Sequence, residues 1–230
     1  MRLALVVALL LLAAPPALAD QGGSLFASNC ARCHGANGSG LPQKGPSLRG
    51  VGARAADFYL RTGYMPLSDS HQQPSRTRVL FTEGQIRAIV GYVASLGTGP
   101  PIPQPKPQQG SVAAGQKLFV DHCAGCHQVL AEGGYVTGAR VPPLSSATNR
   151  EIAEAVRIGP YLMPRFTTAQ LSNRQVDSLI AYVNYTKHPA DPGGWSLGHL
   201  GPWPEGLVTW LIAAVSLVAL CIVIGKRLPS

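Results

Sequence analysis

The chain has 230 residues, of which 46% are hydrophobic and 13% are charged, and its formal net charge is +8. Removing Arg2 with an N-terminal leader, and Lys226 and Arg227 with a C-terminal tail, leaves 16 basic and 11 acidic side chains, a net charge of +5. An excess this small gives no support to a nucleic-acid-binding function. The length suits two small domains with additional targeting or membrane segments.

Residues 1–19 have the pattern of a cleaved secretory signal peptide. Arg2 is the only basic residue, an apolar run extends from Leu3 to Leu12, and Ala17-Leu18-Ala19 precede Asp20. A basic start, an apolar centre and small residues before the cleavage site are typical of such signals. An uncleaved membrane anchor is the alternative interpretation.

Residues 20–97 carry a Cys-x-x-Cys-His motif formed by Cys30, Cys33 and His34. Two thiols at this spacing can form thioether bonds to the two vinyl groups of one haem, while the adjacent histidine reaches the iron. Met65 lies downstream and is followed by proline, where a distal axial ligand is expected. The segment therefore predicts one covalently bound haem c, with His34 and Met65 as axial ligands.

Residues 98–110 contain five prolines, which exclude a regular helix or a central strand. They predict a linker. At about 3.1 Å per residue, a polyproline-like segment of this length could span roughly 40 Å. Docking of the flanking domains could instead fold the segment over their surface, so the sequence leaves the separation of the two domains open.

Residues 111–190 repeat the features of the first segment. Cys123, Cys126 and His127 form the second Cys-x-x-Cys-His motif, and Met163 is again followed by proline. Apart from Met1, Met65 and Met163 are the only methionines in the chain. The sequence therefore predicts a second covalently bound haem c, with His127 and Met163 as axial ligands.

The repeat extends well beyond the ligands, which indicates two whole domains. In both copies a Gly-x-x-Leu-Phe-x-x-x-Cys frame predicts a short amphipathic helix before the motif. Both copies also close with apolar residues at i, i+3, i+4 and i+7 of a helix. The closing positions are Ile86, Ile89, Val90 and Val93 in the first copy, and Val176, Leu179, Ile180 and Val183 in the second. The first copy has an extra polar stretch, from Ser68 to Arg78, which predicts a loop.

Three other interpretations of the cysteine pairs fit less well. A zinc site needs a second pair close by in the same domain, whereas the two motifs are about ninety residues apart, each with its own histidine. A thioredoxin-like pair needs a βαβ context, which the pattern lacks. The two motifs use four of the five cysteines, so none remains for a disulfide framework. The fifth, Cys221, lies in an apolar run.

Each unit resembles a small helical cytochrome c domain. In that family the proline after the motif steadies the haem-ligating histidine, which implies this role for Pro46 and Pro142. The family also packs the glycine and aromatic residue of its first helix against an aromatic residue of its last. The resemblance implies an all-α fold with two tandem cytochrome c domains, in which Gly22, Phe26 and Tyr92 form one such contact and Gly115, Phe119 and Tyr182 the other.

Residues 207–225 are nineteen residues without a charge, followed directly by Lys226 and Arg227 in the tail of residues 226–230. Such a run predicts a transmembrane helix. The basic flank places the C-terminus in the cytoplasm, and therefore the two domains on the extracytoplasmic side of the cell membrane. A buried core helix is the alternative, which the position beyond both domains disfavours.

Residues 191–206 approach this helix through Asp191-Pro192-Gly193-Gly194 and Gly201-Pro202-Trp203-Pro204-Glu205-Gly206. Together with the order of the parts, this run resembles the two-haem cytochrome c subunit of the quinol–cytochrome c reductase (cytochrome bc complex) of high-GC Gram-positive bacteria. That family commonly keeps an N-terminal membrane anchor, from which residues 1–19 depart.

This resemblance implies an electron path. Menaquinol is oxidised on a cytochrome b subunit, a Rieske iron–sulfur protein passes one electron to this chain, and the two haems relay it to a terminal oxidase. The tether implies that the second domain accepts the electron and the first delivers it. The chain would then be an electron-transfer subunit with no catalytic site beyond its haems.

Two other functions remain open from the sequence. A membrane-tethered di-haem electron shuttle would act outside any bc complex. A di-haem peroxidase-type oxidoreductase would need an open sixth position on one iron, against which the two methionines argue. His71, His122, His188 and His199 are most simply surface or structural residues, although His71 and His122 are alternative ligands if a methionine assignment fails.

Overall fold

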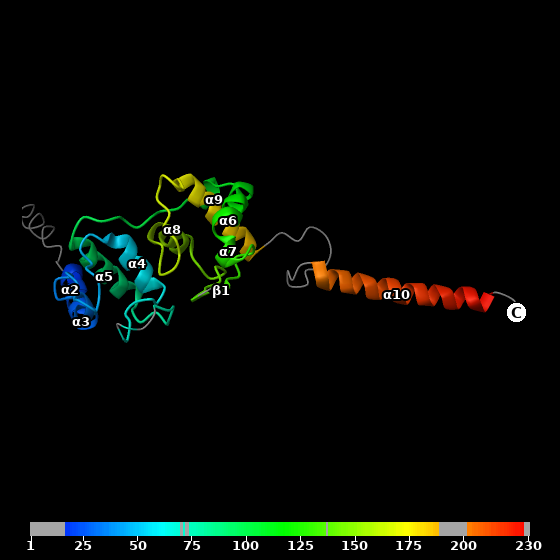
Figure 1. Cartoon of the computed structure of the whole chain (residues 1–230), viewed down its shortest axis with the longest axis horizontal. Helices are drawn as coiled ribbons and strands as arrows, with labels where there is room; N and C mark the ends of the chain where they lie inside the picture. The colour runs from blue at the N-terminus through cyan, green and yellow to red at the C-terminus, as the bar shows by residue number, and fades with distance from the viewer. Residues whose placement is uncertain (1–16, 70, 72–73, 137, 189–201, 228–230) are drawn as a thin grey trace, which may run out of the picture. The chain divides into compact units, whose positions relative to one another are not determined.

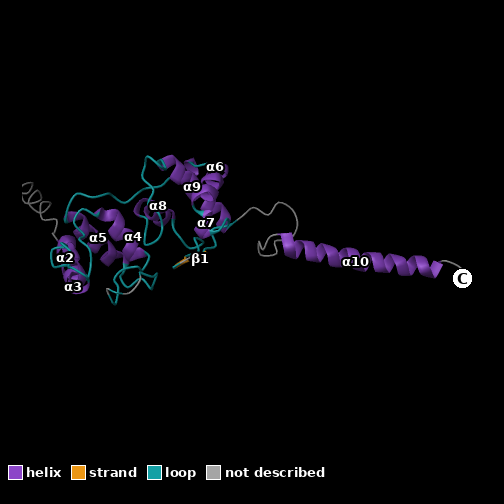
Figure 2. Cartoon of the chain, viewed as in Figure 1, coloured by secondary structure: helices purple, strands orange, loops and turns teal. Residues whose placement is uncertain are grey.

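The computed structural model describes residues 17–69, 71, 74–136, 138–188 and 202–227, with the backbone alone for residues 17–20 and 202–205. These residues are mostly helical (Figures 1 and 2), which confirms the predicted all-α class. The predicted signal peptide, residues 1–19, lies outside them except for its last three residues. Most of the predicted membrane-approach segment, residues 191–206, also lies outside them.

The first domain is built from α2 (Ala17–Asn29), α3 (Ala31–His34), α4 (Gly52–Arg61) and α5 (Glu83–Ser95). Helix α5 begins at a capping box, in which Thr82 accepts a hydrogen bond from the Gln85 amide and the Gln85 side chain accepts one from the Thr82 amide. Its apolar face packs against α2 and α4. The buried core contains Phe26, Leu60, Ile86, Ile89, Val90 and Val93.

Helices α2 and α5 cross at a glycine. A Cβ atom on Gly22 would lie 2.2 Å from the carbonyl oxygen of Ala88, so only glycine allows this approach. One turn further along, the rings of Phe26 and Tyr92 have centroids 5.0 Å apart. The predicted contact between the first and last helices of this domain is therefore confirmed.

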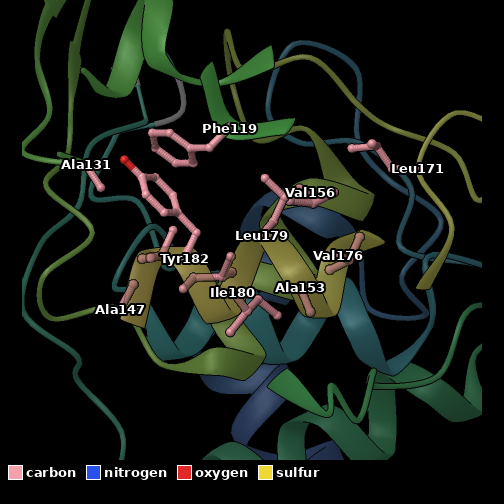
Figure 3. Close-up of a cluster of buried hydrophobic side chains, with 12 residues drawn as sticks. Phe119, Ala131, Ala147, Ala153, Val156, Leu171, Val176, Leu179, Ile180 and Tyr182 are labelled. Atoms are coloured by element: carbon pink, nitrogen blue, oxygen red, sulfur yellow. The ribbon is translucent and has the colours of Figure 1, made fainter. Parts of the chain in front are cut away.

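The second domain contains α6 (Val112–His122), α7 (Ala124–His127), α8 (Asn149–Ile158) and α9 (Asn173–Lys187). It repeats the glycine crossing: a Cβ on Gly115 would lie 1.9 Å from the Ser178 carbonyl oxygen. The rings of Phe119 and Tyr182 have centroids 5.4 Å apart, and Figure 3 shows them facing each other in the core. The buried cluster comprises Phe119, Ala131, Ala147, Ile152, Ala153, Val156, Leu171, Val176, Leu179, Ile180, Tyr182 and Val183.

One small element was not predicted from the sequence. After α7, β1 (Gly134–Val136) and β2 (Ala139–Val141) form an antiparallel pair, with Gly134 opposite Val141. Each strand has three residues, and alternation over so short a run gives little periodic signal. The hairpin places Val136 and Val141 beside the second cysteine motif.

The proline-rich linker lies against both domains instead of spanning free solvent. Ile102 packs on the first core. The Arg54 amide donates to the Pro100 carbonyl (3.2 Å), and the Lys106 amide donates to Asp177 Oδ1 (2.7 Å). A short 3₁₀ turn, η1 (Pro107–Gln109), then leads into α6. Of the two arrangements that the sequence left open, the structure adopts the docked one.

The two domains meet through α4 and α8. Arg150 Nη1 lies 3.5 Å from Asp57 Oδ2, and Arg76 Nη2 lies 3.6 Å from Glu151 Oε1. Each pair joins one domain to the other. The contact is therefore a direct, charged interface.

Helix α10 (Pro202–Arg227) belongs to a separate unit that begins at Tyr185. By length and composition, residues 206–227 could cross a membrane, and their side chains are not buried against other parts of the chain. This agrees with the span predicted for residues 207–225. Trp210 and Cys221 are both exposed on this helix.

Candidate haem sites

Both cysteine motifs fold as a single helical turn directly after a longer helix. The Cys30 amide donates to the Phe26 carbonyl (2.8 Å) and the His34 amide donates to the Cys30 carbonyl (2.9 Å). In the second domain the Cys123 and His127 amides make the same bonds at 2.8 and 2.9 Å. Because residues three apart in a helical turn share one face, each turn presents both thiols to the same side.

All five cysteines are free of disulfides. Burial raises the pKa of the Cys30 and Cys123 thiols to about 11, and the second cysteine of each motif adds to the effect. Among the described residues, no three His, Cys, Asp or Glu side chains cluster as metal ligands. Each motif carries two thiols and one histidine, whereas a structural zinc site takes four protein ligands. The donor set therefore fits covalent haem attachment better than zinc.

His34 is oriented by a backbone carbonyl. Its Nδ1 lies 2.8 Å from the carbonyl oxygen of Pro46, a hydrogen bond in which the ring nitrogen donates. Donation from Nδ1 leaves Nε2 free as a ligand and fixes the ring plane. Pro46 therefore has the position that the resemblance to cytochrome c domains implied.

His127 has Pro142 as its counterpart. Its Nδ1 is buried and makes no hydrogen bond of good geometry within the described residues. Burial lowers the pKa of His127, and the nearby Pro142 carbonyl opposes that shift. The carbonyl is thus close to the ring, in a looser contact than in the first domain. A neutral imidazole is the form that binds iron.

A large crevice opens beside the second motif. Its walls include Cys123, Cys126, His127 and Met163, and it encloses about 1290 Å³ of empty space including its open mouth. The two thiols and the histidine of the motif thus line the same crevice as the predicted axial methionine. Its lining is otherwise mainly apolar and includes Pro142, Leu144, Ile152, Val156, Leu179 and Val183. The residues present therefore fit a haem.

The loop that carries Met163 is held in place by Arg157. This buried side chain donates from Nη1 to the carbonyls of Phe166 (3.3 Å) and Thr167 (3.0 Å), and from Nη2 to Asn173 Oδ1 (2.9 Å). Burial lowers the pKa of Arg157. Since these bonds follow directly after Met163, they hold the predicted ligand on the crevice side of the core.

In the first domain Met65 packs on the same core cluster as Cys30 and Leu48. Its amide donates to the Tyr59 carbonyl at 3.0 Å, which ties the methionine loop to the end of α4. Each methionine thus lies on the core beside its own cysteine motif. Their role as axial ligands remains a prediction.

The other histidines occupy different settings. His122 lines the second crevice and its ring lies edge-on to Phe166, with centroids 5.8 Å apart. His71 is exposed in the polar loop, where its amide donates to Asp69 Oδ1 (2.9 Å). His122 is therefore the better placed of the two alternative ligands, and His199 lies outside the described residues.

A buried carboxyl pair lies at the contact between α4 and α8. Glu154 is fully buried and Asp57 is 1% exposed. Asp57 Oδ1 accepts a hydrogen bond from Arg61 Nε (2.8 Å), whereas Asp57 Oδ2 and both oxygens of Glu154 have no hydrogen-bond donor among the described residues. Burial, reinforced by Asp57, raises the pKa of Glu154 to about 8, while Arg150 and Arg61 partly oppose this. The raised pKa favours the protonated form of Glu154, which can donate a hydrogen bond to Asp57.

Sequence reasoning missed one group of residues at the second crevice. Phe58, Thr62, Tyr64 and Arg76 belong to the first domain, yet they line this crevice. No motif marks them, because their role depends on how the two domains pack.

Known proteins resemble this chain both in part and over most of its length. Residues 19–97 match the family described as cytochrome c, and residues 110–183 match the one described as cytochrome c oxidase, cbb3-type, subunit III. The cytochrome bc1 complex cytochrome c subunit of Mycobacterium tuberculosis is 39% identical over 222 residues, covering 92% of this chain and 79% of that protein. Its namesake in Corynebacterium diphtheriae is 37% identical over 229 residues, covering 92% and 82%.

Two further matches are to an oxidase subunit and to a solved cytochrome structure. The cbb3-type cytochrome c oxidase subunit CcoP of an Azospirillum species is 29% identical over 185 residues, covering 71% of this chain and 60% of that protein. Among solved structures, reduced recombinant cytochrome c4 from Pseudomonas stutzeri matches 72% of this chain and 96% of its own, at 24% identity and a TM-score of 0.26.

Proposed function

The chain belongs to the family of cytochrome bc1 complex cytochrome c subunits, and we propose that it relays single electrons from the Rieske iron–sulfur protein of such a complex to a terminal oxidase. It is thus an electron-transfer component of an oxidoreductase complex. The observation that carries the proposal is the mainly apolar crevice of the second domain, which is lined by both cysteines of one motif, by its histidine and by Met163.

Two haem c groups are proposed, one in each domain. Bound haem supplies a one-electron iron couple. Cys30 and Cys33 would hold one group and Cys123 and Cys126 the other. The axial ligands would be His34 and Met65 in the first domain, and His127 and Met163 in the second.

The residues around each site suit reversible electron transfer. A methionine thioether favours ferrous iron and therefore raises the reduction potential. The lining of the second crevice is mainly apolar, and the Pro46 carbonyl fixes the orientation of His34. Rigid ligands limit the rearrangement that accompanies a change of oxidation state.

The direct contact of α4 with α8 supports transfer within the chain. Both domains are held by this interface and by a linker that is hydrogen-bonded at Pro100 and Lys106. An electron that enters one domain can therefore pass to the other domain without diffusion of either domain. A covalently joined pair of this kind would remove the need for a soluble cytochrome c between the reductase and the oxidase.

The membrane arrangement is part of the same proposal. Helix α10 would anchor the chain by one pass, and Lys226 and Arg227 in its last turn favour a cytoplasmic C-terminus. The haem domains would then lie on the extracytoplasmic side of the cell membrane. The cytochrome b and Rieske subunits would be the partners there, together with the oxidase.

The test is to purify the tagged chain from its native membranes in mild detergent and to record reduced-minus-oxidised spectra before and after adding a menaquinol analogue. We expect b-type haem to co-purify, two c haems per chain, and reduction of the c haems that a quinol-site inhibitor blocks. If c haem alone is present and quinol leaves it oxidised, the chain acts outside a bc complex.

A further inference from the structure

The crevice of the second domain is completed by the first domain. Phe58 and Thr62 from the end of α4, Tyr64 just beyond it, and Arg76 from the polar loop form part of its wall. The Phe58 and Tyr64 rings stack with centroids 6.1 Å apart, and the Thr62 hydroxyl donates to the Phe58 carbonyl (2.6 Å). The ring stacking and the hydrogen bond hold these first-domain residues in fixed positions on the crevice wall.

The polar loop from Ser68 to Arg78 is pinned near both of its ends. Ser68 accepts a hydrogen bond through its carbonyl from Arg32 Nη2 (3.2 Å), within the first cysteine motif. Thr77 donates to the Gly63 carbonyl from both its amide (3.1 Å) and its hydroxyl (2.6 Å). Gly63 has φ +70°, and a Cβ there would lie 2.1 Å from the Thr77 carbonyl oxygen. Arg76 therefore projects from an anchored backbone.

Arg76 is partly withdrawn from solvent at the crevice wall. Its side chain is 35% exposed, and its Nη2 lies 3.6 Å from Glu151 Oε1, whose side chain is 11% exposed. Apart from histidines and cysteines, the titrating or charged side chains on this wall are Tyr64, Arg76, Arg140, Glu151 and Tyr161.

We infer that Arg76 of the first domain is an electrostatic partner of the haem in the second domain, so that docking of the two domains sets the reduction potential of that haem. The inference rests on the proposed function, because it requires haem in the second crevice. Docking would thereby couple the structure of the α4–α8 interface to the direction of electron flow.

The sign of the effect follows from charge. An oxidised haem carries one more positive charge than a reduced haem, so a nearby cation stabilises the reduced form and raises the potential, while a nearby anion lowers it. Arg76 and Glu151 must therefore act in opposite directions. If their ion pair served only to hold the domains together, breaking it from either side would have the same consequence.

The experiment is a potentiometric titration of the purified holoprotein in detergent, following both haems by their absorption bands. Arg76→Gln removes the cation. Glu151→Gln removes the anion and keeps the capping box with Thr148, since a glutamine side chain can also accept the hydrogen bond from the Thr148 amide. Arg78→Gln is the matched control, from the same loop but away from the crevice. A Met163→His variant identifies the transition that belongs to the second haem.

We expect Arg76→Gln to lower the equilibrium constant for reduction of the second haem about tenfold, which is about 59 mV for one electron. Glu151→Gln should raise it, and Arg78→Gln should leave it unchanged. Arg76→Lys, which keeps the charge, should restore most of the wild-type potential. If Arg76→Gln does not yield folded holoprotein, the inference is tested by the other two variants: the direction in which Glu151→Gln shifts the reduction potential, and the reduction potential of Arg76→Lys.

Two results would overturn the inference. If Arg76→Gln and Glu151→Gln shift the reduction potential of the second haem in the same direction, the ion pair of Arg76 with Glu151 is only a structural contact. A shift confined to the first haem, or none at all, would remove Arg76 from the second site. Failure of the proposed function would give a different result. The haem content and the redox change in Met163→His show whether the second domain holds a haem, and neither measurement depends on Arg76.

Discussion

Glu154 offers a direct test of the interface between the domains, because its carboxyl is fully buried beside Asp57 and titrates far from its ordinary range. Burial and Asp57 raise its pKa from 4.5 to about 8. The folded chain therefore holds one more proton than the unfolded chain between these two values. The stabilisation is complete below pH 4.5 and is lost as the pH rises through about 8.

Replacing Glu154 with glutamine should abolish this dependence. One proton difference changes the free energy of unfolding by about 1.4 kcal/mol per pH unit, so between pH 5 and pH 8 the wild-type chain should lose on the order of 2–4 kcal/mol from this group. Glutamine imitates the protonated acid at every pH. The variant should match the wild type near pH 5 and exceed its stability at pH 8.

The assay is guanidinium unfolding of the holoprotein at pH 5, 6.5 and 8. Unfolding is monitored by haem absorbance and by far-ultraviolet circular dichroism. Glu132→Gln is the control, because Glu132 is an exposed glutamate of the same domain. If wild type and Glu154→Gln lose stability equally between pH 5 and pH 8, the carboxyl pair does not hold the proton and the reasoning is wrong.

Three further changes test other parts of the structure. Gly115→Ala would place a Cβ 1.9 Å from the Ser178 carbonyl and should cost about 1–3 kcal/mol in urea unfolding, whereas Gly125→Ala, with open space around it, should cost far less. Thr148→Ala removes the cap of α8 and should lower the free energy of unfolding by about 1 kcal/mol, measured in the same way. Met163→His should lower the potential of one haem by on the order of 0.2 V in a redox titration, within the ~0.8 V that axial ligands span; an unchanged potential would exclude Met163 as a ligand.

The sequence was sufficient for the features that local chemistry dictates. Two thiols and a histidine within five residues need only one helical turn to face the same side, as Cys30 to His34 does. The apolar spacing from Ile86 to Val93 predicts a buried helical face, which α5 confirms. A long uncharged run at residues 207–225 is apolar enough to cross a bilayer wherever it lies in the fold. In each case the information lies within a few turns of chain.

Other features depended on segments that are far apart in the sequence. Whether the linker extends or docks was decided by the Lys106 amide meeting Asp177, 71 residues away. The short hairpin of β1 and β2 carries too few residues to show a period. The glycine crossings at Gly22 and Gly115 were expected from family resemblance, but the close approach that requires glycine is visible only when two helices are packed together.

The interface between the domains is where the tertiary structure decided most. Asp57 and Glu154 are ordinary acidic residues in the sequence, and only burial beside Asp57 raises the pKa of Glu154. Arg76 reads as part of a polar loop, and only the docking of the two domains places it on the wall of the second crevice. Covalent ligands are specified by neighbours in the chain, whereas the electrostatic environment of a haem is the sum of charges brought near it by folding, which no local pattern encodes.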